Sequence, residues 1–374
     1  MKIPFINLNA QYRAYKEEID KAMENVLDST QYIMGDDMNA LQEELSAFCG
    51  ARYTRVVSSG TDALLLSLMA LDIKEGDEVI TTPFTFIATA EMIALLGGKP
   101  VFVDIDEHTY NINPANLESA ITPRTKAIIP VSLYGLCADM DSINSIANSH
   151  KIPVIEDGCQ SFGAKYKKKF SCNLSTIGTT SFFPSKPLGC YGDGGAVFCN
   201  DENLDSKIGS LLNHGQTARY VHKYIGLNAR LDSLQCAILR VKLKHFAKEC
   251  KTREQKAQHY ANNLKNLILP TIAQDYESVY AQYSVRLNPQ ISKNGARERV
   301  CERLNQKGVP TAVHYPIPLH LQESLRYLGY KEGDFPISEK IAKEIFSLPF
   351  SAFLSQEEQD YIIQTLNGIT DSLK

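Results

Sequence analysis

The sequence predicts an α/β protein with a mainly parallel central sheet flanked by helices and a smaller α+β domain at the C-terminal end. Between about residues 54 and 200, short runs of β-branched residues alternate with helical patterns, which is typical of parallel strands joined by crossover helices. After residue 231 this alternation gives way to one long helical pattern. Because 374 residues exceed the span of one hydrophobic core, we expect two domains, 1–245 and 246–374.

The first domain contributes the predicted sheet and the helices that connect its strands. Runs rich in β-branched residues predict strands at 55–59, 77–82, 99–106, 127–133, 154–158, 179–183 and 194–200. Helical patterns between these runs predict helices at 61–71, 86–98, 113–121 and 139–149. Gly97 and Gly98 close the second of these helices, and Asn113 with Pro114 begins the third.

The long helical pattern runs from about residue 231 to 267 with few helix-breaking residues and joins the smaller second domain to the first. Strands are expected at 279–287 and 310–315. A last helix is expected to start at Ser355, because Glu358 three residues later completes a capping box.

Composition and charge exclude several kinds of partner. A formal charge of −4 gives no electrostatic reason to expect nucleic acid or an anionic membrane. No apolar run reaches the roughly 20 residues that cross a bilayer, and no signal peptide is expected. The nine cysteines are scattered singly, which is typical of reduced thiols in a cytoplasmic protein. They form no cluster with the eight histidines at metal-ligand spacing, so no metal is expected.

The segment SSGTDAL (58–64) is the first of three that indicate chemistry. Gly60 permits a tight backbone where a strand ends, and Thr61 and Asp62 begin a helix. Free N–H groups and the helix dipole at such a junction favour a phosphate. The alternative is an ordinary strand-to-helix turn.

The other two segments supply a carboxylate and an amine. Glu156 and Asp157 follow a buried strand, at the sheet edge where ligands bind in open α/β sheets, although either acid could instead cap a helix. Lys186 lies between Pro184 and Pro187 in a stiff, glycine-rich loop. A lysine that is held in place and partly desolvated can lose its proton and attack a carbonyl, whereas most surface lysines are simply solvated.

Together these segments form a coherent site of phosphate cradle, carboxylate and amine at one edge of the sheet. Pyridoxal 5'-phosphate, a phosphorylated pyridine aldehyde, needs these three parts. The carboxylate would keep the ring nitrogen protonated, and the amine would hold the aldehyde and then move protons. The residues alone therefore predict an enzyme dependent on pyridoxal phosphate.

The chain resembles the DegT/DnrJ/EryC1/StrS family of sugar aminotransferases over nearly its whole length. The resemblance rests on the motifs PFINLNAQY, SSGTDAL, TPFTFIATAEMI, EDGCQSFGA, SFFPSKPLGCYGDGGAVF, NHGQTARY, GLNARLDSLQ, HYPIPLHLQ and SLPFSAFLS. It implies the type I fold of pyridoxal-phosphate-dependent aminotransferases, with the cofactor bound by the larger domain. It also implies that Lys186 forms the Schiff base with the cofactor and is the catalytic residue.

The resemblance assigns further cofactor contacts by position. Asp157 would pair with the pyridine nitrogen and Gln160 with the ring hydroxyl. Phe86 would stack on the ring, although it could also be a core aromatic. The phosphate would be held by Gly60, Thr61 and Ser181, and by Asn228 of a neighbouring subunit. The enzyme would then be a homodimer with two shared active sites.

The resemblance also indicates the substrates. Arg230, His314 and Tyr315 match positions that face the sugar nucleotide or the edge of the cofactor, although His314 could instead be a packed residue of an edge strand. L-glutamate would donate the amine and leave as 2-oxoglutarate. The acceptor would be a nucleotide-linked keto sugar aminated at C3, with UDP-2-acetamido-2-deoxy-3-oxo-glucuronate as first choice because Arg230 could pair with its carboxylate. The product would enter cell-surface polysaccharide synthesis, for example of lipopolysaccharide.

Other interpretations of the function stay open. The acceptor could be a dTDP-3-oxo-6-deoxyhexose or a 4-keto sugar. Related sugar dehydratases carry histidine in place of the Schiff-base lysine, so Lys186 argues against dehydration. A regulator that binds the cofactor without catalysis is a remote alternative, because Lys186, Asp157 and Gln160 are all present.

Overall fold

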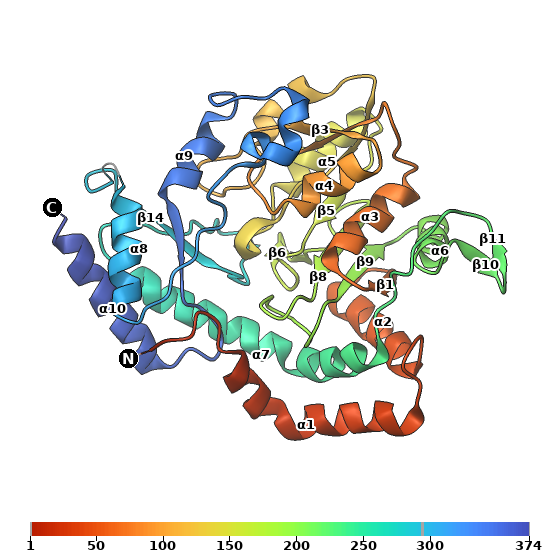
Figure 1. Ribbon diagram of the computed structural model, residues 1–374, viewed down its shortest axis with the longest axis horizontal. Coiled ribbons are helices and arrows are strands. Elements are labelled where there is room, and N and C mark those ends of the chain that lie inside the picture. Colours follow the sequence, from red (N-terminus) through yellow and green to blue (C-terminus); the bar gives the residue numbers. More distant parts are fainter. Residues whose placement is uncertain (1, 293–294, 374) are drawn as a thin grey trace.

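The computed structural model describes residues 2–292 and 295–373 and is built around a central sheet (Figure 1). Its strands lie in the order β3, β2, β4, β5, β8, β9, β1, because single bridges from Ile128 to Val154 and from Val131 to Asp157 join two hydrogen-bonded groups of strands. Neighbouring strands run parallel except at β9, which is antiparallel to β8 and β1. The strands are β1 (Tyr53–Val57), β2 (Glu78–Thr81), β3 (Lys99–Phe102), β4 (Thr125–Ile128), β5 (Ile155–Asp157), β8 (Ile177–Ser181) and β9 (Gly195–Cys199). The predicted, mainly parallel α/β sheet is confirmed.

Helices cover both faces of this sheet because successive residues of each strand point to opposite sides. Val57 packs into a cluster with α3, α4 and α6, whereas its neighbour Val56 packs with α2 and α7 on the other side. Helix α5 covers the second side near β2 and β4. The helices are α1 (Leu8–Ser29), α2 (Asp36–Cys49), α3 (Gly60–Ala70), α4 (Ala88–Leu95), α5 (Met140–Ser149), α6 (Glu202–Leu211) and α7 (Ser233–Asn263).

The C-terminal part is a smaller sheet covered by two helices. Strand β14 (Tyr283–Leu287) lies between β12 (Leu267–Ile268) and β15 (Ile345–Leu348). Helices α8 (Ala296–Gln306) and α10 (Gln356–Asp371) cover this sheet, and α9 (Pro336–Glu344) precedes β15. Residues near the N-terminus join the same core: Ile3 N–H donates to Gly308 C=O, and Phe5 C=O accepts from Phe350 N–H. Helix α7 runs across residue 245, so the division at that point stays a prediction.

Small elements complete the fold. The remaining short strands are β6 (Lys165–Tyr166), β7 (Lys169–Phe170), β10 (Gln216–Ala218), β11 (Val221–His222) and β13 (Tyr276–Glu277). The 3-10 turns are η1 (Pro114–Asn116), η2 (Glu118–Ala120), η3 (Leu133–Gly135), η4 (Leu319–Leu321) and η5 (Glu323–Leu328). Among the described residues, no helix is both long and apolar enough to cross a membrane, and no cluster of three or more His, Cys, Asp or Glu side chains is placed to hold a metal.

Two predicted elements differ from the structure. The helix expected at 113–121 is a pair of 3-10 turns, although Asn113 caps the first of them as expected. The strand expected at 310–315 is wrong, since this segment makes a single bridge from Ala312 to Ser347. Pro310 and Pro316 lack the N–H groups that a longer ladder would need. The predicted capping box at the start of α10 is confirmed.

Candidate active site

A cavity of about 500 Å³ lies where the carboxyl ends of β5 and β8 meet the start of α3. Its wall brings together nine of the eleven predicted site residues: Gly60, Thr61, Phe86, Asp157, Gln160, Ser181, Lys186, His314 and Tyr315. These residues come from five separate segments, so the chain assembles the cavity only when the sheet and the C-terminal part are both in place.

The start of α3 supplies free backbone donors at one end of the cavity. Ser59 is the N-cap, and its side chain accepts a hydrogen bond of 3.0 Å from Asp62 N–H. The N–H groups of Gly60 and Thr61 come before the first backbone hydrogen bond of the helix, so they point out of its end. A Cβ atom at Gly60 would lie 2.6 Å from Cβ of Ser181, so glycine is needed for this close approach. An anion fits here, attracted by the N–H groups and the helix dipole.

Asp157, at the end of β5, presents a buried carboxylate to the cavity. The residue is 4% exposed. Its Oδ2 accepts from Thr89 Oγ1 at 2.8 Å and its Oδ1 from the N–H of Cys159 at 3.1 Å. These two neutral donors fix the carboxylate but leave its charge unpaired, so it is ready for a cationic N–H from a ligand.

Glu156, the neighbouring acid, lies outside the cavity. Strand alternation turns it to the opposite side of the sheet, where it accepts from Ser132 Oγ at 2.9 Å, Ser171 Oγ at 2.7 Å and Cys172 N–H at 2.7 Å. Burial raises the pKa of Glu156 in spite of these bonds. It is a structural acid outside the cavity.

The amide of Gln160 has a defined orientation. Its Oε1 accepts from Tyr134 N–H at 2.9 Å, so its NH2 group is directed to the other side. That NH2 group donates to Tyr315 Oη at 3.1 Å and retains a second N–H for a ligand oxygen. The geometry suits an amide that donates to a ring hydroxyl.

Lys186 lies in the loop after β8, and its backbone N–H donates to Phe183 C=O at 2.9 Å. The residue is partly exposed towards the cavity, but its amine is surrounded by protein groups. Burial lowers the pKa of this amine, and the nearby Cys159 and Asp157 offset the effect only in part. A lowered pKa raises the fraction of neutral amine that can attack an aldehyde.

Aromatic and imidazole side chains, those of Phe86, His314 and Tyr315, form another part of the cavity wall. Phe86 is 55% exposed and its ring lies 6.4 Å from that of Tyr315, so it is no core aromatic. His314 Nδ1 lies 3.0 Å from Ser347 Oγ. Burial, followed by the charge of Lys186, lowers the pKa of His314, so its ring is neutral at neutral pH. Burial also raises the pKa of Tyr315, which therefore keeps its proton.

Asn228 and Arg230 are the two predicted residues that lie outside the cavity of their own chain. They follow the β10–β11 hairpin, which projects from the body in Figure 1. Asn228 is exposed. Arg230 Nη1 donates to Asn213 at 2.9 Å, while its Nε is buried without a partner among the described residues. A single chain therefore does not bring these two side chains to Lys186.

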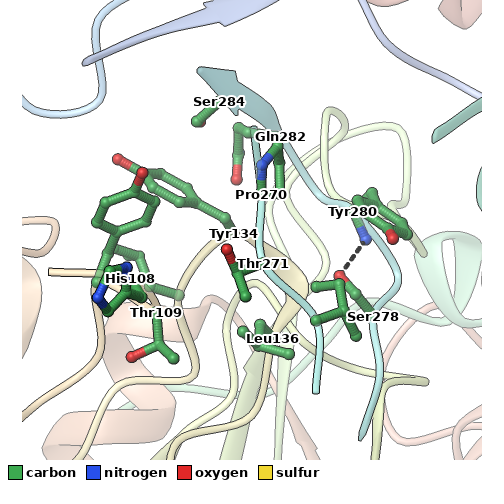
Figure 2. Close-up of a pocket in the computed structure, with 13 residues that line it drawn as sticks. His108, Thr109, Tyr134, Leu136, Pro270, Thr271, Ser278, Tyr280, Gln282 and Ser284 are labelled. Carbon is green, nitrogen blue, oxygen red and sulfur yellow. Dashed lines mark hydrogen bonds between the residues drawn. The ribbon is translucent and has the colours of Figure 1, made fainter. Parts of the chain in front are cut away.

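A small second cavity of about 20 Å³ lies behind this wall (Figure 2). Gln282 belongs to the walls of both cavities, and its Oε1 is buried with no hydrogen-bond partner in the described structure. In Figure 2 Gln282 lies across from Thr271 in this space, which has room for about one water molecule. Such a water would satisfy the buried amide oxygen.

Sequence reasoning missed the residues that orient the site. Thr89 and Tyr134 hold Asp157 and Gln160 from segments 68 and 26 positions away, and no local spacing indicates such contacts. The cap at Ser59 was detectable, because a serine directly before a predicted helix is a common N-cap.

Comparison with known proteins identifies the kind of enzyme. The family model of the DegT/DnrJ/EryC1/StrS aminotransferases matches residues 13–367. The chain belongs to this family. It is therefore an aminotransferase dependent on pyridoxal phosphate, as the cavity predicts.

Individual relatives of this aminotransferase share its full length. It is 51% identical over 354 residues, 94% of this chain and 96% of the other, to the UDP-2-acetamido-2-deoxy-3-oxo-D-glucuronate aminotransferase of Pseudomonas aeruginosa. It is 42% identical over 371 residues, 98% of each chain, to a Geobacillus stearothermophilus protein named pleiotropic regulatory protein. The crystal structure of NtdA from Bacillus subtilis with bound cofactor PMP matches with a TM-score of 0.91 and 31% identity, over 99% of this chain and 85% of that chain.

The described walls of the aminotransferase cavity fit pyridoxal phosphate. The start of α3 offers N–H groups that precede its first helical hydrogen bond, Gly60 leaves room beside Ser181, and Asp157 offers a carboxylate held by neutral donors. The amine of Lys186 faces the same space. Each part of the cofactor thus has a chemically matched group in the protein.

Proposed function

We propose that this aminotransferase moves the amino group of L-glutamate, which leaves as 2-oxoglutarate, to C3 of UDP-2-acetamido-2-deoxy-3-oxo-glucuronate. The observation that carries the reaction type is the meeting of Lys186, Asp157 and the start of α3 around one cavity. The choice of sugar is supported by the Pseudomonas aeruginosa relative, whose name contains this keto sugar. The product would serve the assembly of a cell-surface polysaccharide such as lipopolysaccharide.

The described residues divide the work of binding. Gly60, Thr61 and Ser181 would hold the phosphate, and Asp157 would accept a hydrogen bond from the protonated ring nitrogen. The cofactor, when bound, withdraws electrons from the carbon that loses its proton. Gln160 would donate to the ring hydroxyl, and Phe86 would cover one face of the ring.

Lys186 moves the proton. Its neutral amine would take the proton from the carbon that carries the amino group and return it to a second carbon nearby, as general base and then acid. Burial of the amine lowers its pKa and so favours the neutral form that this transfer needs. His314, as a neutral imidazole, and Tyr315, as a protonated phenol, would then line the cavity and form hydrogen bonds with the substrates.

A second copy of the chain would complete the site. Asn228 and Arg230 stand away from their own cavity, beside a projecting hairpin with exposed apolar side chains. Tyr220, Val221 and Ile225 of this region are 77%, 56% and 90% exposed. We infer a homodimer in which Asn228 of each chain reaches the phosphate of the other, and Arg230 faces the sugar.

A panel of acceptors tests the proposed substrate. The pyridoxamine form of the enzyme, prepared with L-glutamate, is mixed with UDP- and dTDP-linked 3-keto and 4-keto sugars. Fastest return of the aldehyde-form absorbance with the UDP-3-oxo-glucuronate supports the proposal. Fastest return with a dTDP-3-oxo-6-deoxyhexose selects that alternative. No response to L-glutamate or to any sugar would favour a regulator, the role in the name of the Geobacillus relative.

A further inference from the structure

The loop that carries Lys186 folds back on itself. Cys190 N–H donates to Phe182 C=O at 2.8 Å, so the two arms of the loop meet. On the returning arm, a Cβ atom on Gly189 would lie 2.6 Å from Phe183 C=O. The returning arm therefore packs directly against the arm that leads to Lys186, with no room for a methyl group between them.

Lys242 of α7 contacts the returning arm of this loop. It is 1% exposed, and its Nζ donates a hydrogen bond to Gly189 C=O. The same amine lies 4.9 Å from the centre of the Tyr191 ring. No carboxylate of the described residues forms an ion pair with it; the nearby charged or titratable groups are Glu249, on its own helix, and Cys190, on the loop.

A second residue of α7 binds the same arm. Gln235 Oε1 accepts from Tyr191 N–H at 2.8 Å. Helix α7 thus holds the loop at two successive points, Gly189 and Tyr191, three and five residues after Lys186.

An amine at position 242 is costly for the fold apart from the hydrogen bond and the ring contact that it makes to the loop. A buried ammonium without a counter-ion costs free energy, and apolar side chains of similar volume are commonly neutral or stabilising at such sites. Burial accordingly lowers the pKa of Lys242 to about 8. Within the part of the chain that the structure describes, the hydrogen bond and the ring contact of this amine both go to the loop of Lys186.

We propose that Lys242 is a positioning residue for Lys186: by binding Gly189 C=O from α7, it fixes the returning arm of the loop and thereby the place of the reactive amine. Lys242 itself touches neither the substrate nor the cofactor site. A proton transfer needs its partners at a defined separation, and a displacement of 1 Å can lower a rate about 100-fold.

The test compares three holoenzymes: wild type, Lys242→Met and Lys244→Met. Lys244 is an exposed lysine of the same helix and serves as the matched control. Three quantities are measured: the melting temperature, the turnover with L-glutamate as donor and the UDP-linked 3-oxo-glucuronate as acceptor, given as kcat and KM, and hydrogen–deuterium exchange of the peptide covering 182–192. The kinetic part rests on the proposed donor and acceptor, but the exchange and melting measurements do not.

Lys242→Met should lower kcat about 10-fold or more with KM within a factor of about two. Exchange should rise in 182–192 alone, and the melting temperature should stay equal or rise. Unchanged kcat with unchanged loop exchange would overturn the proposal, as would a lower melting temperature with faster exchange throughout the chain. If the wild type itself shows no turnover, the proposed donor or acceptor fails, and loop exchange still decides the role of Lys242. If Lys242→Met does not fold, Lys242→Gln takes its place in the same three measurements.

Discussion

Two adjacent acids, Asp157 and Glu156, have different surroundings in the folded chain. Asp157 faces the cavity with two neutral donors, whereas Glu156 faces the core with three. The residue pattern placed both acids at the end of one strand, and the family resemblance predicted a contact with the ring nitrogen for Asp157 alone. The donors that hold each acid could not be predicted, because most of them lie in other segments.

Exchanging each acid for its amide should separate these roles. Asp157→Asn should lower kcat by about 100-fold or more, because the uncharged amide no longer holds the ring nitrogen protonated. Glu156→Gln should leave kcat within a few-fold but lower the free energy of unfolding by about 1–3 kcal/mol, because one of its three donors loses its acceptor. Urea unfolding and steady-state kinetics on both variants check this. Equal losses of activity in the two variants would contradict the assignment.

Arg230 is the residue proposed to bind the carboxylate of the sugar. Within the described structure its guanidinium makes one hydrogen bond, from Nη1 to Asn213, so its Nη2 group keeps donors for a carboxylate. Arg230→Ala should raise KM for a uronate acceptor about 10-fold or more while KM for L-glutamate stays the same. Measuring both half-reactions separates the two constants. A uronate turned over as well as before would remove the carboxylate role.

At the scale of elements, the start of α3 lies so close to β8 that only glycine fits at position 60. Gly60→Ala would place a methyl group 2.6 Å from Ser181, so the helix start and β8 must separate. Affinity for pyridoxal phosphate should fall about 10-fold or more, since the separated N–H groups no longer meet one phosphate. Titration of the cofactor-free protein followed by absorbance measures this.

Gly368→Ala, within α10, is the matched control because no atom lies within 4 Å of the added methyl group. It should leave cofactor affinity unchanged and stabilise the protein by about 0.5–1 kcal/mol. Loss of affinity in this control, or normal affinity in Gly60→Ala, would argue against the cradle.

Helix α7 adds a dependence of stability on pH. Burial lowers the pKa of Lys242 from 10.5 to about 8, so between these values the unfolded chain binds more protons than the folded chain. The free energy of unfolding of the wild type should therefore rise as the pH rises from about 8 to 10.5. Below about pH 8 the buried amine stays charged and lowers the free energy of unfolding by its full amount, on the order of 3 kcal/mol. Lys242→Met should thus exceed the wild type in stability most at pH 7 and least at pH 10. Urea unfolding at the two pH values checks this, and a constant difference would contradict it.

The elements show why much of the fold could be predicted and part could not. Strands and helices of the sheet follow local periodicity, which the sequence displays directly. The segment 310–315 has the composition of a strand, but Pro310 and Pro316 limit it to one bridge. The contacts of Lys242 and Thr89 join segments far apart in the chain, so only the folded structure brings them out.

At the scale of the whole molecule, the proposed dimer can be tested by mixing two inactive variants. Lys186→Ala should lower kcat by at least about 100-fold, and Asn228→Asp should weaken cofactor binding by placing a carboxylate against the phosphate. If each site takes Lys186 from one chain and Asn228 from the other, every mixed dimer keeps one intact site. Refolding the variants together should then restore about a quarter of wild-type activity. No gain over the separate variants would exclude shared sites.

The hydrogen bonds of Ile3 and Phe5 also set the separation over which the C-terminal core must close. Ile3 binds Gly308, and Phe5 binds Phe350, near α10 (Figure 1). Each pair joins residues that are more than three hundred positions apart in the sequence. Because contacts between such distant segments form only after the chain between them has been brought together, the C-terminal core that supports His314 and Tyr315 should close late in refolding.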